Sequence, residues 1–365
     1  MVRRIFLITT YDCNLRCKYC YELNKHVGSF NVSTTIEILT KEFEQKQYDE
    51  FRISFYGGEP FLEFTKIKEI CEWMWSSYPQ NNILVQVSTN GTVLTDDIRQ
   101  WLKKNEKKIV VSISIDGGRD DHNLSRGKSF ELIDIPFFTS LNGIKAKMTV
   151  TPDTIGNAMQ NFLYLKSMGF NVSLSMAQEI EWTADQLTVY QQQLALFIEY
   201  ILNNPKEELP PFFRYKIYKL APNRHGESRW NCGSGYFEVA YDIDGNFYPC
   251  HAYAAQFREY DSGQINAITH TLINSSFDNT MLICKDCLYK HVCSPCHGFN
   301  YTNRGKMENI SSITCQMNKM AIRATIKLYT LAIPKKNDYV WLVNVSESEL
   351  LDIINGIKFF VGHEL

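Results

Sequence analysis

The first 204 residues alternate between short apolar segments and longer segments in which apolar residues recur at helical spacing. The short segments favour β-strands at 5–10, 51–57, 83–91, 109–118, 144–151 and 171–177. The longer segments favour helices at 34–46, 64–75, 95–104, 157–170 and 186–204. Six strand–helix units in succession predict a parallel sheet covered by helices. A full barrel needs eight such units, so we expect an open, partial (β/α)6 barrel of the TIM type.

Polar residues and glycines lie at the carboxyl ends of four of the predicted strands or in the loops after them. Cys13 and two further cysteines follow the first strand, and the end of the second has 57–60, that of the third 88–91 and that of the fourth 114–117. The carboxyl ends of parallel strands meet at one edge of a sheet, where active sites of such folds lie. The pattern therefore predicts a reactive site at this edge.

The second half of the chain has a different pattern. After 205–211 the sequence becomes irregular and rich in turns, with closely spaced cysteines. We expect a barrel at 1–205, a bridging segment at 206–231, a cysteine-rich domain at 232–333 and a tail at 334–365. The tail favours a strand at 339–345 and then a helix, with Ser346 and Glu349 as a possible capping box.

The composition limits the classes of partner. Lys and Arg number 38 and Asp and Glu number 40, so no excess of positive charge points to nucleic acid or to an anionic membrane. No apolar run approaches the ~18 residues of a membrane-spanning helix. We expect a cytoplasmic protein with neither nucleic acid nor membrane as partner.

The chain has 11 cysteines, which in a reducing compartment indicate metal ligands rather than disulfides. Three lie at 13, 17 and 20, and seven lie between 232 and 315. Cys71 stands alone on a predicted helix, where a buried apolar role is the simplest interpretation.

The spacing Cys13-x3-Cys17-x2-Cys20 places three thiolates on one short loop. A cubane cluster with three protein ligands keeps one iron open for a small chelating molecule. A structural zinc is the alternative, but it takes four protein ligands, and His26 is the only local candidate for the fourth.

The segment YDCNLRCKYCYE, with aromatic Tyr19 before the third cysteine, resembles the radical S-adenosylmethionine (SAM) superfamily. The resemblance implies that the open iron binds the methionine part of SAM and that Tyr19 lies by its adenine. It implies contacts of the glycine-rich stretch with the methionine amino group, and of further residues with the ribose and carboxylate. The stretch is Gly57, Gly58, Glu59 and Pro60, and the further residues are Ser88, Asn90, Ser114, Asp116 and Arg126. Each further residue could equally serve as a turn, cap or surface residue.

The C-terminal cysteines resemble the SPASM extension of this superfamily, which carries two auxiliary [4Fe-4S] clusters. The resemblance implies cluster I on Cys232, Cys250 and Cys296, and cluster II on Cys284, Cys287, Cys293 and Cys315. The spacing between Cys293 and Cys296 is one residue shorter than usual, and no cysteine lies just before Cys232. Cluster I is therefore one ligand short. Its fourth site is either an open iron or a local ligand such as His225, Glu227 or Ser228.

This resemblance implies an oxidoreductase with SAM and three [4Fe-4S] clusters that oxidatively modifies a ribosomally made precursor peptide, through a thioether or carbon–carbon crosslink. It also implies an electron donor such as flavodoxin or ferredoxin. The alternatives are formylglycine formation, as in anaerobic sulfatase maturases, and oxidation of a small alcohol. The sulfatase maturases have a basic aspartate where this chain has His251, which could itself accept a proton. A non-catalytic iron–sulfur protein would need neither Tyr19 nor the stretch 57–60.

Overall fold

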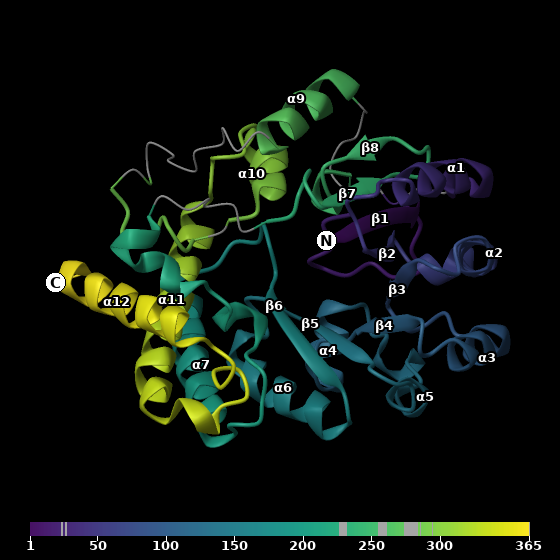
Figure 1. The fold of residues 1–365 in the computed structure, drawn as a ribbon. Helices are drawn as coiled ribbons and strands as arrows, with labels where there is room; N and C mark the ends of the chain where they lie inside the picture. Colours follow the sequence, from purple (N-terminus) through teal and green to yellow (C-terminus); the bar gives the residue numbers. More distant parts are fainter. Residues whose placement is uncertain are drawn as a thin grey trace. The chain divides into compact units, whose positions relative to one another are not determined.

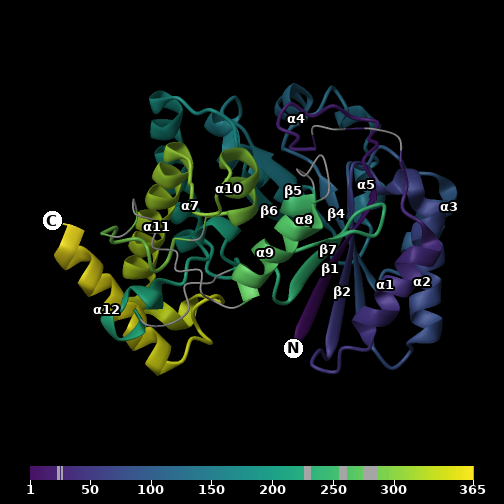
Figure 2. The same ribbon diagram turned by 90° about the horizontal axis from the view of Figure 1, so that it is seen from above.

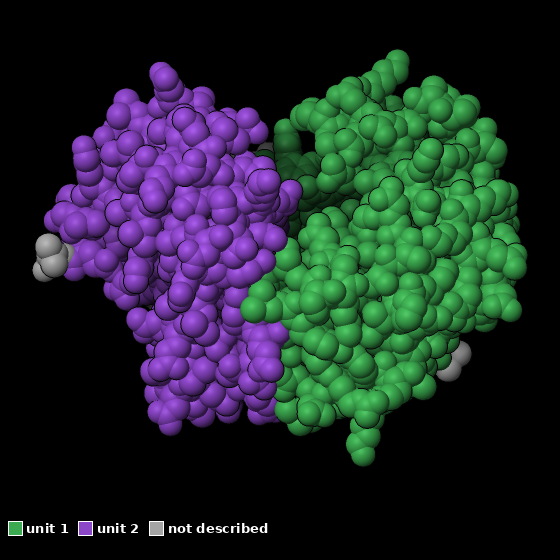
Figure 3. Space-filling view, turned by 90° about the horizontal axis from the view of Figure 1, so that it is seen from below, with its two compact units in different colours: residues 1–149, 161–173, 233–276 green, residues 150–160, 174–232, 277–365 purple. Residues whose placement is uncertain are grey.

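A computed structural model gives the fold of the chain, and it describes all residues except 23–24, 26–27, 226–231, 255–260, 274–283, 285, 294 and 365. The chain forms two compact units, coloured separately in Figure 3. Unit 1 contains Met1–Thr149, Asn161–Ser173 and Gly233–Ser276, and unit 2 contains Val150–Gln160, Leu174–Cys232 and Phe277–Leu365. The predicted division into four segments is not tested by these units and stays a prediction.

The six predicted strands are confirmed, and they lie in the predicted order in one sheet (Figure 1). Two short strands from the second half join the same sheet, whose order is β6-β5-β4-β3-β2-β1-β7-β8. The strands are β1 (Val2–Thr10), β2 (Glu50–Gly57), β3 (Asn82–Thr89), β4 (Ile109–Ser114), β5 (Lys145–Val150), β6 (Asn171–Met176), β7 (Glu238–Tyr241) and β8 (Phe247–Tyr248). The fold is thus the predicted α/β partial barrel with a cysteine-rich C-terminal region.

The predicted helices are also present, together with several that the apolar pattern did not indicate. In unit 1, α1, α2 and α3 lie along one face of the sheet (Figure 2). In the described part of the chain the α-helices longer than four residues are α1 (Val32–Phe43), α2 (Phe64–Ser77), α3 (Asp96–Lys104), α4 (Arg119–Ser125), α5 (Ile135–Thr139), α6 (Ala158–Ser167), α7 (Ala184–Asn203), α9 (Ser262–Ile273), α10 (His297–Arg304), α11 (Ser312–Ala332) and α12 (Glu347–Glu364). None of the helices in the described part of the chain is both long and apolar enough to cross a membrane.

The core of unit 1 is built from apolar residues of its central strands. Ile5 on β1, Ile53 and Phe55 on β2, and Val85 and Val87 on β3 have no exposed surface. The residues on β2 and on β3 lie two positions apart and so share one face of the sheet, and β3 alternates buried with partly exposed residues. Cys71 on α2 is fully buried, which confirms the prediction of a buried apolar role.

Strand β7 was not predicted, and it explains why the segment Gly233–Ser276 belongs to unit 1. It pairs in parallel with β1, with Arg4 opposite Glu238 and Leu7 opposite Tyr241. The strand has only four residues, too few for a clear two-residue period. This pairing ties a segment from the second half of the sequence to the first strand.

The predicted strand at 339–345 is wrong. These residues form turns, in which the Val340 amide donates to the carbonyl of Pro205 at 3.0 Å. Their apolar side chains are explained by packing, because Tyr339 and Leu342 are buried with Ala332 in a small cluster of unit 2. The following helix is confirmed as α12, and the Glu349 amide donates to Ser346 Oγ at 3.2 Å, one half of the expected capping box.

Candidate active site

The loop after β1 places the three N-terminal cysteines at the carboxyl edge of the sheet. The loop starts with a local turn, in which the Cys13 amide donates to Asp12 Oδ1 at 2.8 Å. It closes with the Cys20 amide donating to the Cys17 carbonyl at 3.2 Å. Burial raises the pKa of the Cys13 and Cys17 thiols, and the positive charge of Arg126 opposes this at Cys17. A bound metal would be needed to hold these sulfurs as thiolates at neutral pH.

Two glycines hold the next loop directly against the cysteine loop. The Gly58 amide donates to the Thr10 carbonyl at 2.8 Å, and the Glu59 amide donates to the Asp12 carbonyl at 2.9 Å. A Cβ at Gly58 would lie 1.9 Å from the Asp12 oxygen, and one at Gly57 would lie 2.3 Å from the Thr10 oxygen. Gly57 also has a φ of 122°, which other residues rarely adopt. Glycine is therefore required here by close backbone approach.

The carboxylate of Glu59 accepts hydrogen bonds from three groups of the protein. Oε1 accepts from Thr89 Oγ1 at 2.7 Å and from the Phe61 amide at 3.1 Å, and Oε2 accepts from the Asn90 amide at 2.7 Å. Burial raises the pKa of this carboxyl, and these hydrogen bonds oppose the rise. The side chain thus ties the loop after β2 to the loop after β3. A direct contact of Glu59 with a ligand stays a prediction.

Asp116 connects two other predicted residues, Tyr19 and Arg126, with the backbone of β5. Its Oδ2 accepts from Arg126 Nε at 2.8 Å and from the Tyr19 hydroxyl at 2.7 Å, and its Oδ1 accepts from the Thr149 amide at 2.9 Å. Arg126 lies over the Tyr19 ring, 5.2 Å from its centre, and its Nη1 is 3.8 Å from Cys17 Sγ. A buried arginine is therefore fixed beside the cysteine loop with part of its guanidinium directed at a cysteine.

A cavity within unit 1 brings most of the predicted residues together. It is lined by Cys13, Cys17, Cys20, Tyr19, Gly57, Gly58, Ser88, Asn90, Ser114 and Arg126. Glu59, Pro60 and Asp116 do not line it, although Glu59 and Asp116 hold residues that do. Three cysteine sulfurs, a buried guanidinium and a glycine-lined wall match the chemistry of an iron–sulfur cluster with a zwitterionic amino-acid ligand.

The same cavity contains residues that the sequence did not single out. Lys147 on β5 donates to Ser88 Oγ at 2.7 Å and lies 5.4 Å from the centre of the Tyr56 ring. Burial lowers the pKa of Lys147 to about 8, assisted by the charges of Lys145 and Arg126. Tyr21 and Tyr56, which also line the cavity, share a hydrogen bond between their hydroxyls. The alternation of Lys147 with buried Ala146 and Met148 was the available signal, since it places Lys147 on the other face of the strand.

His251 lies behind this cavity rather than in its wall. Its ring packs on Phe6 and Tyr56, with centres 4.5 and 5.0 Å away. Burial lowers its pKa to about 4, assisted by the charge of Lys147, so the imidazole is neutral at pH 7. Its Nδ1 is buried without a hydrogen-bond partner among the described residues. A catalytic role for His251 stays a prediction.

The predicted ligands of cluster II lie together in unit 2. Cys284, Cys287, Cys293 and Cys315 line one small cavity with Tyr289 and Lys319. Burial raises the pKa of Cys293 to about 12, and a hydrogen bond from Asn318 opposes the rise. Within the described residues, no three His, Cys, Asp or Glu side chains lie close enough to share one metal ion. A cubane carries its ligands on separate corners, so its cysteines stand further apart than those around one zinc.

The predicted ligands of cluster I are divided between the units. Cys250 belongs to unit 1, and Cys232 and Cys296 belong to unit 2, so this cluster stays a prediction. Of its possible fourth ligands, Glu227 and Ser228 fall outside the described residues. His225 stacks on His291, with ring centres 3.9 Å apart, and its Nε2 is 3.0 Å from the Leu220 carbonyl. The alternative zinc ligand His26 also falls outside the described residues.

Comparison with known proteins agrees with this geometry. The sequence profile of the radical SAM superfamily matches residues 7–177, the segment that contains the cysteine loop and the glycine-rich stretch. Residues 7–177 belong to the radical SAM superfamily. The cysteine-type anaerobic sulfatase-maturating enzyme of Clostridium novyi is 22% identical over 336 residues, covering 77% of this chain and 84% of that enzyme. An uncharacterized protein of Methanocaldococcus jannaschii is 33% identical over 116 residues, covering 32% of this chain and 39% of that protein.

Solved structures share the fold over most of this chain. The structure of native anSMEcpe with bound AdoMet and Cp18Cys peptide has a TM-score of 0.70 at 18% identity, covering 92% of this chain and 100% of that one. Streptococcus suis SuiB bound to precursor peptide SuiA has a TM-score of 0.62 at 15% identity, covering 87% of this chain and 76% of that one. The likeness extends beyond the barrel into the cysteine-rich region, and at these identities it concerns the fold alone.

Proposed function

We propose that this radical SAM protein oxidatively modifies a peptide substrate. The observation that carries the proposal is the cavity in unit 1, where Cys13, Cys17 and Cys20 face Arg126 and the glycine loop. The fold of the chain is similar to the folds of anSMEcpe and SuiB, both solved with peptides, and this supports a peptide as the substrate class. A thioether or carbon–carbon crosslink is the reaction we favour.

Each residue of the cavity has a task in this proposal. Cys13, Cys17 and Cys20 would hold a [4Fe-4S] cluster with one open iron, and Lys25, Arg126 and Lys147 are the cations of the cavity wall for the carboxylate of SAM. When bound, the reduced cluster and SAM would together supply the carbon radical that takes a hydrogen atom from the substrate. The glycine loop and Tyr19 shape the cavity so that the radical meets only the intended hydrogen.

The thioether reaction removes two hydrogens from the peptide. One C–H bond and one S–H bond of the peptide break, and one C–S bond forms. One electron from a donor of the flavodoxin or ferredoxin class breaks the 5′-carbon–sulfur bond of SAM, which leaves methionine, and the hydrogen atom from the peptide carbon ends on 5′-deoxyadenosine. The thiol proton leaves to a base, and the remaining electron of the peptide is returned to the donor. Clusters on Cys284, Cys287, Cys293 and Cys315, and on Cys232, Cys250 and Cys296, are proposed to relay that electron.

The experiment compares two peptides with the anaerobically reconstituted protein, SAM and a reductant. One is the product of a short reading frame beside the gene, and the other is a cysteine-containing sulfatase peptide. Mass spectrometry should show loss of two hydrogens from the first, without an aldehyde that reacts with a hydrazide probe. An aldehyde on the sulfatase peptide alone would instead support the formylglycine alternative. If neither peptide changes while 5′-deoxyadenosine accumulates, the peptide substrate class is wrong.

A further inference from the structure

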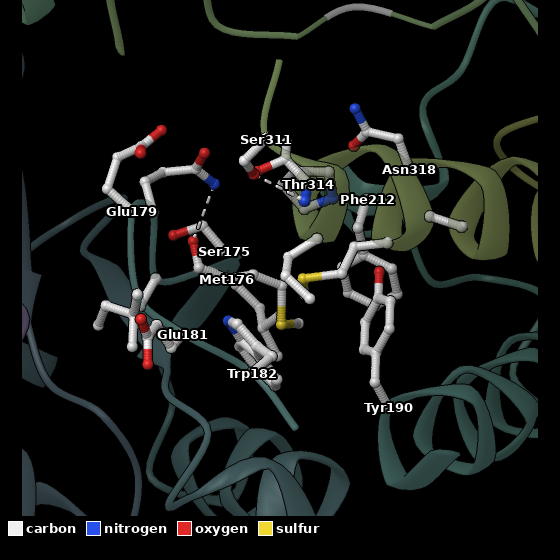
Figure 4. Close-up of a pocket in the computed structure, with 18 of the residues that line it drawn as sticks. Ser175, Met176, Glu179, Glu181, Trp182, Tyr190, Phe212, Ser311, Thr314 and Asn318 are labelled. Atoms are coloured by element: carbon white, nitrogen blue, oxygen red, sulfur yellow. Dashed lines mark hydrogen bonds between the residues drawn. The ribbon is translucent and has the colours of Figure 1, made fainter. Parts of the chain in front are cut away.

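A second cavity, of about 430 Å³, lies within unit 2 and shares a helix with the second cysteine set (Figure 4). Helix α11 turns Thr314, Met317, Asn318 and Ala321 toward this cavity, a spacing of three and four residues that marks one helix face. The neighbouring face carries Cys315 and Lys319, which line the cysteine cavity. Asn318 therefore stands at the border between the two.

The side-chain amide of Asn318 contacts both a cysteine of the predicted cluster II and a residue of the larger cavity. Its Nδ2 donates to Cys293 Sγ at 3.5 Å, and its Oδ1 accepts from the Tyr215 hydroxyl at 3.4 Å. A ligating sulfur can only accept, so the Nδ2 end of the amide faces Cys293 and the oxygen is left to accept from the Tyr215 hydroxyl. Tyr215 itself lines the larger cavity.

We propose that Asn318 is a positioning residue that sets the reduction potential of the cluster on Cys284, Cys287, Cys293 and Cys315, through its N–H···S hydrogen bond to Cys293. Hydrogen bonds to ligand sulfurs are among the factors that set such potentials. The reduced cluster carries one more negative charge, so an N–H donor stabilises it more than the oxidised cluster. Loss of the donor must therefore make the cluster harder to reduce. This inference rests on the proposed cluster, but not on the proposed peptide substrate.

The test uses full-length protein in which Cys13, Cys17 and Cys20 are alanine, so that only auxiliary clusters contribute. The signal of interest is the electron paramagnetic resonance signal lost on Cys287→Ala. Asn318→Leu should lower the equilibrium constant for one-electron reduction of the cluster that gives this signal about tenfold, which corresponds to 59 mV. Tyr215→Phe keeps the ring and should shift the constant in the same direction, but less. Met317→Leu, at the neighbouring position of α11, is the matched control and should leave it unchanged.

A second measurement needs no substitution that could disturb folding. Protein labelled with 15N-asparagine should show a nitrogen coupled to the reduced cluster, together with a proton coupling that disappears in deuterium oxide. Absence of both couplings would overturn the proposal, as would equal potentials for Asn318→Leu and Met317→Leu. Failure of the background protein to hold iron that depends on Cys287 would overturn it too, whatever happens with peptides.

Discussion

Arg126 donates from Nε to Asp116 Oδ2 across 2.8 Å, and both side chains are buried at the edge of the sheet that holds the cysteine loop. The carboxylate compensates the charge of the guanidinium and leaves Nη1 beside Cys17. The pair is therefore both a structural element of unit 1 and a means of presenting a cation to the cavity.

A double-mutant cycle on this pair tests its structural role. Asp116→Asn or Arg126→Met alone should lower the free energy of unfolding by about 3–5 kcal/mol, because each leaves a buried charge without its partner. The double variant should cost less than the sum of the two. Urea denaturation of the unloaded protein measures all three. The exposed ion pair between Arg119 and Glu131 is the control, and Arg119→Ala should cause no measurable loss. Strict additivity at Arg126 and Asp116 would contradict the coupling.

Gly58→Ala tests the contact between the two loops. A Cβ at this position meets the Asp12 carbonyl oxygen at 1.9 Å, so the cysteine loop must move. We expect reconstituted protein to lose about a third of its iron, the share of one cubane in three. Gly156→Ala is the control, because its Cβ would meet nothing within 4 Å and its φ is not positive. Full iron content in Gly58→Ala would show that the loop tolerates the displacement.

Lys147→Met tests the electrostatic cost of the buried ammonium. The pKa of Lys147 falls from 10.5 to about 8 on folding, so the unfolded chain binds more protons between these values. The cost of keeping Lys147 charged is fully present below pH 8 and disappears as the pH rises toward 10.5. The variant should thus exceed the wild type in free energy of unfolding by about 3 kcal/mol at pH 7, with the gain vanishing near pH 10.5.

The matched control for this prediction is Lys145→Met, at an exposed position two residues earlier on β5. It should show no comparable dependence of the difference on pH. Thermal or urea unfolding across pH 7–10.5 measures both variants against the wild type. A gain for Lys147→Met that stays constant over this range would contradict the lowered pKa.

The sequence predicted the parts of the site whose signal is local. Cys13, Cys17, Cys20 and the glycine stretch each lie within one loop, and the strands before them have a strong apolar pattern. The structure places these loops at one edge because parallel strands align their carboxyl ends. Local spacing and sheet topology were sufficient for this level of prediction.

The parts that were missed depend on partners far apart in the sequence. The hydrogen bonds of the Glu59 carboxylate to Thr89 and Asn90 were not predicted, because these partners lie about 30 residues away. Lys147 was not singled out, because only the packed sheet shows that its face of β5 meets Ser88 and Tyr56. The apolar residues at 339–345 were predicted as a strand, but they form turns and their apolar side chains pack in a cluster of unit 2.

The formation of 5′-deoxyadenosine from SAM tests the central claim most directly. The anaerobically reconstituted wild type should hold about twelve iron atoms per chain, if all three cubanes form, and should produce 5′-deoxyadenosine when reduced. The variant with Cys13, Cys17 and Cys20 replaced by alanine should keep about two thirds of this iron and produce none. Continued SAM cleavage by that variant, or stoichiometric zinc with little iron in the wild type, would contradict the assignment of this site.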